Sequence, residues 1–142
     1  MNNKVTKEFR DINCEIGKYI KTNTHHFYNN LNPTQLHILF YLINNEDQDI
    51  CQKQIEKEIH IKKASVTGSL DSLEEKGFIQ RIASKEDKRK KYIKITQMVK
   101  NERKAIETTI SNLEDKLTDG ISKKELDQFI MIVNKMKKNL ED

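Results

Sequence analysis

The segment from Lys62 to Thr96 places the tightest constraint on the fold of this chain. Its first part carries apolar side chains at i, i+4 and i+7, the spacing of a helix with one buried face: Val66, Leu70 and Leu73. Gly77 follows, and glycine suits the position after a helix because it accepts a left-handed backbone. Two short apolar segments, 78–83 and 91–96, flank a charged turn. The sequence therefore predicts a helix that leads into a β-hairpin.

Another helix is predicted directly before this one, from Gln52 to Ile59, burying Ile55 and Ile59. Only residues 60–63 connect the two, and His60 among them is a residue type that can take a left-handed backbone. Two helices joined by so short a connection form a helix-turn-helix candidate.

The next helix towards the N-terminus has a well-marked start. Asn32 can cap it, Pro33 suits its first position, and Gln35 can complete a capping box. Its predicted buried face consists of Leu36, Leu39, Phe40 and Ile43.

Both ends of the chain are predicted to be amphipathic helices. Residues 5–28 carry an apolar stripe at spacings of three and four: Val5, Phe9, Ile12, Ile16 and Ile20. Residues 97–117 carry a similar stripe, and Gly120 ends it. Ser122 and Glu125 then form a capping box for a last helix, which we expect to bury Leu126, Phe129, Ile130, Val133, Met136 and Leu140.

The terminal stripes are too extensive to remain in water. They must be buried against each other or against a second copy of the chain, and two-fold pairing is the commonest solution. The alternative is a monomer whose terminal helices cover the core. With 142 residues, we predict one domain over 1–142 of a mainly α (α+β) winged helix-turn-helix fold, with a winged core at 32–97 and helical dimerisation regions at 1–31 and 98–142.

Positive charge is concentrated in the predicted hairpin. Between Arg81 and Lys94 there are seven basic and two acidic residues, a net +5, whereas the whole chain carries +4. The remainder therefore sums to −1. A cationic projection on a near-neutral body is suited to phosphate, and a hairpin beside a helix can enter two neighbouring grooves of a duplex.

The helix before the hairpin offers a face of small side chains opposite its buried one. Small residues allow close approach to a groove floor, and hydroxyl groups bond phosphates or base edges. Lys62 and Lys63 add positive charge where the helix dipole is also positive. The candidate DNA contacts are Lys53, Gln54, Lys62, Lys63, Ser65, Thr67, Gly68, Ser69, Ser72, Asp87, Lys88, Arg89, Lys90 and Lys91.

Arg89 is the sharpest of these candidates. At the tip of a hairpin an arginine can enter a minor groove and respond to its width and potential. Asp87 is expected to hold the Arg89 guanidinium in a fixed fork, which lowers the cost of ordering it.

These motifs together resemble the MarR family of bacterial and archaeal transcriptional regulators: Asn32-Pro33-Thr34-Gln35, the segment 52–81, and the Asp87-x-Arg89 hairpin followed by YIKIT. The resemblance implies an obligate homodimer with interleaved terminal helices, a recognition helix in the major groove and a wing arginine in the minor groove. On that pattern Ser65, Val66 and Thr67 match the start of the recognition helix. Gly68 and Ser72 depart from it, since many relatives have arginine there.

The resemblance also implies a repressor relieved by a small aromatic or phenolic effector, bound between the dimerisation helices and the winged core, on a pseudo-palindromic operator. Candidate lining residues are Tyr19, His25, His26, Phe27, Tyr28 and His37. Some relatives instead sense oxidants through a cysteine of the first helix. Cys14 lies in such a helix, where Arg10 and Lys18 favour a reactive thiolate and Glu15 opposes it.

Other classes of function find little support in the sequence. Phosphate-binding loops and hydrolase motifs are absent, the cysteines and histidines lack metal-ligand spacing, and no cofactor is expected. No apolar run approaches the ~18 residues of a membrane span, and no secretory signal is apparent, so we expect a cytoplasmic protein with reduced thiols. The competing class is a winged-helix module whose hairpin contacts an acidic protein instead of DNA.

Overall fold

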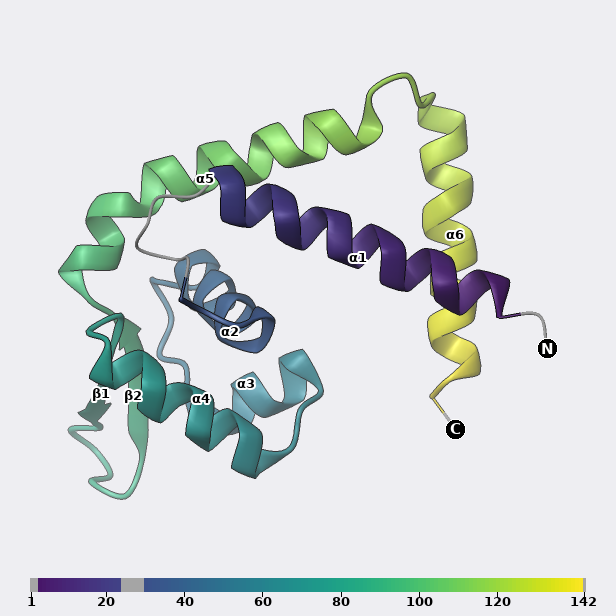
Figure 1. The fold of residues 1–142 in the computed structure, drawn as a ribbon. Helices are drawn as coiled ribbons and strands as arrows, with labels where there is room; N and C mark the ends of the chain where they lie inside the picture. Colours follow the sequence, from purple (N-terminus) through teal and green to yellow (C-terminus); the bar gives the residue numbers. More distant parts are fainter. Residues whose placement is uncertain (1–2, 24–29, 142) are drawn as a thin grey trace.

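The computed structural model describes residues 3–23 and 30–141, and this part of the chain forms six helices and one two-stranded antiparallel sheet (Figure 1). In chain order the elements are α1 (Lys4–Asn23), α2 (Pro33–Asn44), α3 (Gln52–Ile59), α4 (Lys63–Glu75), β1 (Ile79–Ala83), β2 (Lys91–Ile95), α5 (Gln97–Thr118) and α6 (Lys123–Asn139). The predicted fold class is confirmed. The first helix was predicted to continue to Tyr28, but residues 24–28 lie outside the described part.

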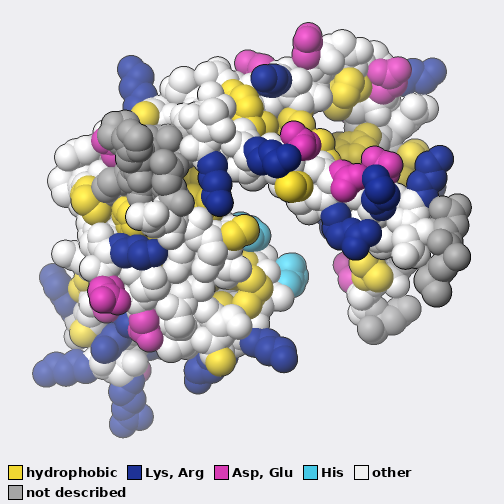
Figure 2. All heavy atoms as spheres, viewed as in Figure 1, with side chains coloured by type: hydrophobic (Ala, Val, Ile, Leu, Met, Phe, Trp, Pro, Cys, Tyr) yellow, Lys and Arg dark blue, Asp and Glu magenta, His cyan; other side chains and the backbone are white. Residues whose placement is uncertain are grey.

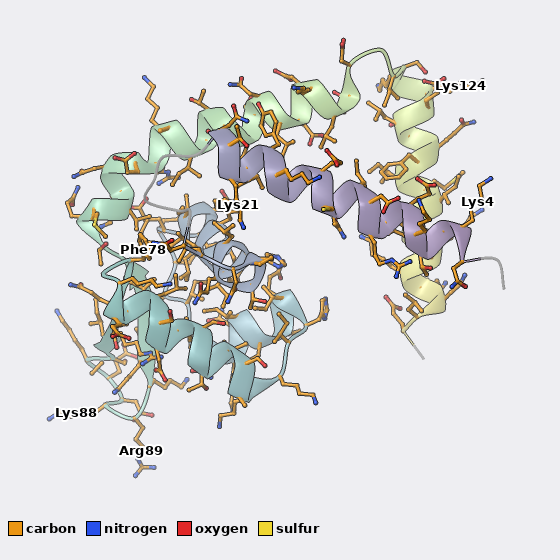
Figure 3. All side chains as sticks on the ribbon, viewed as in Figure 1. Lys4, Lys21, Phe78, Lys88, Arg89 and Lys124 are labelled. Carbon is orange, nitrogen blue, oxygen red and sulfur yellow. The ribbon has the colours of Figure 1, made fainter. Side chains whose placement is uncertain are left out.

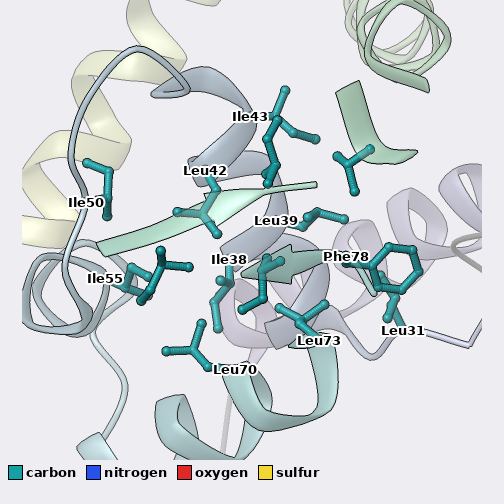
Figure 4. Close-up of a cluster of buried hydrophobic side chains, with 14 of the residues drawn as sticks. Leu31, Ile38, Leu39, Leu42, Ile43, Ile50, Ile55, Leu70, Leu73 and Phe78 are labelled. Atoms are coloured by element: carbon teal, nitrogen blue, oxygen red, sulfur yellow. The ribbon is translucent and has the colours of Figure 1, made fainter. Parts of the chain in front are cut away.

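Residues 31–96, which we call the winged lobe, surround one hydrophobic core (Figure 4). Helices α2, α3 and α4 each contribute side chains with no more than 6% exposure, and β1 and β2 close the cluster from the other side. Two residues of α5, Val99 and Ile106, are also buried in it. The start of α5 is therefore fixed to the lobe by apolar packing as well as by the chain itself.

Helix α2 begins as the sequence predicted. The Asn32 side chain accepts a hydrogen bond from the Gln35 amide at 2.8 Å, and the Gln35 side chain accepts one from the Asn32 amide at 3.0 Å. Pro33 occupies the first helical turn. The capping box thus satisfies amides that an uncapped helix leaves without partners.

The predicted buried face of α2 was only half right. Leu39 and Ile43 are buried, whereas Leu36 and Phe40 are only half-buried. The other deeply buried positions are Gln35, Ile38 and Leu42. Helix α2 contacts α3, α4 and β2, so it is covered from several directions, and a single periodic stripe does not mark its interior side.

The connection between α3 and α4 has the predicted backbone. His60 adopts φ 54° and ψ 41°, and it is the one non-glycine residue with positive φ in the described ranges 3–23 and 30–141. A left-handed residue turns the chain sharply enough for α4 to follow α3 within three residues.

The hairpin that follows α4 also matches its prediction. Strands β1 and β2 pair antiparallel, from Ile79 opposite Ile95 to Ala83 opposite Lys91. Ile50 adds an isolated bridge on the outer side of β2, where the Ile93 amide donates to the Ile50 carbonyl at 2.8 Å. Inward-facing Ile79, Ile93 and Ile95 join the core, which holds the base of the hairpin against the lobe.

The terminal helices extend away from the lobe (Figure 1). No described residue of α1 or α6 is buried. Among the described elements, α5 is the one that α1 contacts extensively. Helices α1 and α6 therefore do not cover the core of the lobe in this structure, in contrast to the packing that the monomer alternative assumed. No helix of the described part is long and apolar enough to cross a membrane.

The predicted burial of the last helix is not achieved within one chain. Phe129, Ile130 and Leu140 are 55%, 54% and 85% exposed. Leu126, Val133 and Met136 are only half-buried. The described part of one chain offers α6 no surface that covers its apolar residues, so the amphipathic pattern of α6 is unsatisfied in this structure.

Candidate DNA-binding surface

Helix α4 separates a buried face from a face of small exposed residues. Val66, Leu70 and Leu73 are each 0% exposed, as predicted. On the opposite side Ser65 and Gly68 are exposed, and a Cβ atom placed on Gly68 would have no neighbour within 4 Å. Ser69 and Ser72 are both half-buried. The helix therefore presents mainly backbone and short side chains to the outside.

Thr67 has a structural role that the sequence did not reveal. Its hydroxyl donates to the Lys63 carbonyl at 2.9 Å and accepts from the Gln52 side chain of α3 at 2.7 Å. One acceptor site remains, so Thr67 has less freedom than Ser65 to bond a ligand. The Gln52–Thr67 hydrogen bond joins α3 to the first turns of α4.

The start of α4 is open and cationic. Lys62 is its N-cap residue and makes no side-chain capping hydrogen bond, and Lys62, Lys63 and Lys53 are all exposed. Uncapped amides and the helix dipole both favour an anion at such an end. In α3 the Gln54 side-chain oxygen is already engaged, because it accepts from the Cys51 amide at 2.8 Å.

The tip of the hairpin is shaped by Asp87. Its carboxylate accepts from the Arg89 backbone amide at 3.0 Å, and its carbonyl accepts from the Lys90 amide at 3.0 Å. Below the tip, Ser84 is buried, donates its amide to the Lys90 carbonyl at 2.8 Å, and accepts from the Glu86 and Asp87 amides. The turn is thus closed by short-range hydrogen bonds of the kind aspartate and serine favour.

The predicted contact between Asp87 and the Arg89 guanidinium is absent. Among the described residues Asp87 binds the backbone amide of Arg89 instead, and both Lys88 and Arg89 project from the tip into solvent (Figure 3). The reason is geometric, since a carboxylate two residues before an amide closes a tight local turn without ordering a long side chain.

The seven basic residues between Arg81 and Lys94 divide into two groups. Arg81 forms ion pairs with Asp71 and Glu74, and Lys94 pairs with Asp49, so both serve the fold. The other five are exposed and make no ion pair with a described residue: Lys85, Lys88, Arg89, Lys90 and Lys91. Figure 2 shows dark blue side chains radiating from this end of the molecule. Free positive charge is therefore gathered at the hairpin tip, which we call the wing tip (residues 85–91).

One predicted effector residue lies in a groove. Tyr19 of α1 is half-buried in a groove of about 540 Å³ between α1 and α5, with Lys116 Nζ 5.4 Å from the centre of its ring. The groove is lined by Glu15, Ile16, Lys18, Tyr19, Thr22, Asn23, Leu113, Lys116 and Leu117. The α5 residues were missed because nothing in the local pattern connects positions about a hundred residues apart.

Of the other effector candidates, His37 alone lies in the described part of the chain. His37 lies on α2 and is not among the lining residues of this groove. His25, His26, Phe27 and Tyr28 lie outside the described residues. The predicted cluster of histidines and aromatic side chains is therefore represented here by Tyr19 alone.

The surroundings of Cys14 give its thiol little cationic support. Cys14 is exposed, and Lys18 is held by Glu15, whose hydrogen bond is the main cause that raises the pKa of Lys18 above its ordinary value. Cys14 also raises the pKa of Lys18 but contributes less than Glu15, so the Lys18 ammonium serves mainly the carboxylate. No three metal-ligating side chains gather within the ranges 3–23 and 30–141.

An exposed helix-turn-helix beside a projecting cationic hairpin defines a winged helix-turn-helix protein. Residues 31–91 match the model of the MarR family. Similar solved structures include a MarR transcription regulator from Oenococcus oeni, with 22% identity over 95% of this chain and 99% of that chain and a TM-score of 0.79. The family model thus matches most of the winged lobe, and the resemblance to the MarR family inferred from the motifs is confirmed over that part of the chain.

Two further similar structures bear on function. S. aureus MepR in a DNA-binding conformation has 25% identity over 97% of this chain and 99% of that chain, with a TM-score of 0.80. The heme sensor PefR from Streptococcus agalactiae, in complex with heme, has 26% identity over 99% of this chain and 95% of that chain, with a TM-score of 0.68.

The role of Asp87 in the wing tip can be tested by two substitutions. Asp87→Asn keeps an oxygen that accepts from the Arg89 amide, whereas Asp87→Ala removes it. We expect the Arg89 amide to exchange with solvent about fivefold faster in Asp87→Ala and to change little in Asp87→Asn, as measured by hydrogen exchange. Equal acceleration in both variants would show that charge, not the hydrogen bond, shapes the turn.

Proposed function

We propose that the protein is a homodimeric, sequence-specific regulator that binds double-stranded DNA, represses transcription and is released by a small effector. The observation that carries this proposal is the free positive charge of the wing tip beside the exposed face of α4. Both are held by one core, so they form a rigid pair of projections for adjacent grooves.

In this proposal α4 enters the major groove. Its small outer face lets the helix lie close to the base edges, and Ser65 is the hydroxyl available to bond them. Lys62 and Lys63 lie where the duplex backbone would pass the start of the helix. Because α4 offers no arginine, backbone contacts contribute most of its affinity and base contacts a smaller part.

Arg89 enters the neighbouring minor groove. The Asp87 turn fixes the backbone that carries it, while its guanidinium remains unpaired among the described residues. An unpaired arginine at a rigid tip is suited to the negative potential of a narrow, A·T-rich groove. Lys88, Lys90 and Lys91 then lie near the flanking phosphates.

The comparison with MepR supports a DNA-competent arrangement. The chain has a TM-score of 0.80 with MepR in its DNA-binding conformation but 0.66 with a point mutant of MepR, at 25% identity in both cases. Because the sequence identity is the same, the difference reflects the arrangement of the elements. The arrangement of elements in this chain is thus nearer to MepR in its DNA-binding conformation than to that mutant, which supports the proposed DNA binding.

Dimerisation follows from the unsatisfied terminal helices. Apolar residues of α1 and α6 that are 39–55% exposed in one chain would be covered by the same helices of a second copy: Val5, Phe9, Ile12, Phe129, Ile130, Met131 and Ile132. Two lobes held in this way present two α4 helices to successive half-sites of a pseudo-palindromic operator. The division into a winged core at 32–97 and dimerisation regions at 1–31 and 98–142 stays a prediction.

The groove between α1 and α5 is the best candidate for the effector. Tyr19 supplies a ring face, Leu113 and Leu117 supply apolar walls, and Lys116 supplies positive charge, a combination suited to a small aromatic or phenolic anion. The similar protein PefR is a heme sensor, which supports a ligand-responsive role for this chain. An occupant between α1 and α5 would alter their packing and thereby the spacing of the two lobes.

DNA binding is tested by the salt dependence of affinity. We expect log Kd for a duplex containing the protein's own promoter to rise steeply with log salt, and Arg89→Ala and Lys62→Ala each to lower the slope by about one. Fluorescence anisotropy over a series of salt concentrations measures this. Lys135→Ala, in the exposed outer part of α6, is the matched control and should leave the slope unchanged.

If the wild-type protein binds no duplex even at low salt, the proposal fails and the protein-interaction module takes its place. A slope that falls equally in the Lys135→Ala control would mean that the charge of the whole chain, rather than the wing, drives binding.

Dimerisation is tested on α6. Introducing charge into its exposed apolar patch, with Phe129→Glu and Ile130→Glu together, should weaken self-association by about 100-fold or more, because a carboxylate would have to be buried in the interface. Sedimentation equilibrium measures the change. The adjacent exposed Gln128→Glu is the control, and a wild-type protein that sediments as a monomer at micromolar concentration would contradict the proposal.

The effector groove is tested with benzoate and its hydroxylated derivatives as probes. Calorimetry should show that Lys116→Met weakens binding by about fivefold and Tyr19→Leu by more, since the cation and the ring face are lost in turn. Lys124→Met on α6 should change nothing. Binding that is the same in Lys116→Met and in wild type would place any effector elsewhere.

A further inference from the structure

We propose that Arg81 is a positioning residue for DNA binding, which fixes the wing against α4 through two carboxylates of that helix. The inference rests on the proposed function, because it concerns how the two DNA-contacting elements are held at one angle. The sequence had grouped Arg81 with the cations of the hairpin, as a potential contribution to phosphate attraction.

The geometry around Arg81 is that of a clamp. Its guanidinium contacts Asp71 Oδ1 at 2.7 Å and Glu74 Oε1 at 3.4 Å, and its backbone amide donates to Glu74 Oε2 at 3.1 Å. Glu74 thus holds both the main chain and the side chain of Arg81. The Arg81 side chain is 22% exposed, so it lies against the protein and not in the free cationic group.

The two acceptors are placed by the helical repeat. Asp71 and Glu74 are three residues apart, so both lie on the side of α4 that faces β1. A guanidinium carries donors on a planar fork and can serve two carboxylates at once, which an ammonium on a flexible stem does less well.

The clamp acts beyond the bend that leads from α4 into the hairpin, in addition to the core packing that holds the hairpin base. Between α4 and β1 the chain passes through Gly77, whose φ of +82° marks a sharp bend. At that bend the hairpin base is tied by the Thr96 hydroxyl, which donates to the Gly77 carbonyl at 2.7 Å. Arg81 adds a second link to α4 further along β1. Two links at separate points resist rotation of the wing better than the Thr96 hydrogen bond alone.

Helix α4 is accordingly held at both ends. The Gln52–Thr67 hydrogen bond joins its first half to α3, and Arg81 joins its second half to β1. A duplex fixes the relative positions of its major and minor grooves, so two projections that already have the matching angle lose less freedom on binding.

The signs of the charges make the proposal testable. Asp71 and Glu74 belong to the helix proposed to contact DNA, and negative charge near phosphate opposes binding. If they served no other purpose, neutralising them would tighten binding. If they hold Arg81, neutralising them loosens the wing and weakens binding in spite of the more favourable charge.

The experiment compares isosteric neutral variants by anisotropy at fixed salt, on the promoter duplex and below the melting transition of every variant. We expect Asp71→Asn and Glu74→Gln each to weaken binding by about fivefold. Glu75→Gln is the control, because Glu75 is an exposed neighbour on α4 that makes no ion pair with a described residue. It should bind as tightly as wild type or more tightly.

Arg81 itself gives the second measurement. Arg81→Ala should weaken binding by about tenfold while leaving the log–log salt slope unchanged, whereas Lys88→Ala should lower that slope by about one. Adding Asp71→Asn to Arg81→Ala should cost nothing further, because both changes break the same clamp.

Two results would overturn the clamp while leaving DNA binding intact. Either Asp71→Asn and Glu74→Gln tighten binding as Glu75→Gln does, or Arg81→Ala lowers the salt slope as a phosphate contact would. A wild-type protein that binds no duplex would instead end the proposed function itself, so the two failures are distinguishable.

Discussion

The burial of one side of α4 is the interaction on which the rest of the structure depends. Val66, Leu70 and Leu73 are completely buried, and burying side chains of this size contributes about 1.5–3 kcal/mol each. Because the three positions share one face, the opposite face must point outwards. The same packing that stabilises the lobe therefore exposes Ser65 and Gly68 and determines where the hairpin after Gly77 begins.

Ion pairs then decide which of the many cations remain available. Arg81 and Lys94 form ion pairs within the winged lobe. Arg103 and Lys100 form ion pairs that join the lobe to α5. Exposed pairs of this kind contribute ~0–1 kcal/mol each to stability, so their main effect is on geometry and on the distribution of charge. The cations of the wing tip remain unpaired among the described residues because Asp87 accepts from a backbone amide and Glu86 forms no ion pair with them.

Sequence patterns anticipated the features that depend on neighbours along the chain. Helical repeats located α3 and α4, capping residues located the starts of α2 and α6, and the short connection between α3 and α4 indicated the helix-turn-helix. Features that depend on contacts across the chain were missed. The clamp at Arg81, the tie between Gln52 and Thr67 and the Lys116 side of the effector groove all join segments that no local repeat relates.

The path from the proposed effector groove to the DNA-binding surface runs through α5. Glu46, in the turn after α2, pairs with Arg103 and lies 3.6 Å from Lys100, and Val99 and Ile106 are buried in the lobe. The first half of α5 is therefore one body with the lobe, while its second half carries Lys116 and the groove. A ligand in the groove can change the affinity for DNA only to the extent that it stabilises one packing of α1 and α5 over another. Because α5 is one continuous helix from Gln97 to Thr118, it joins the groove to the lobe directly.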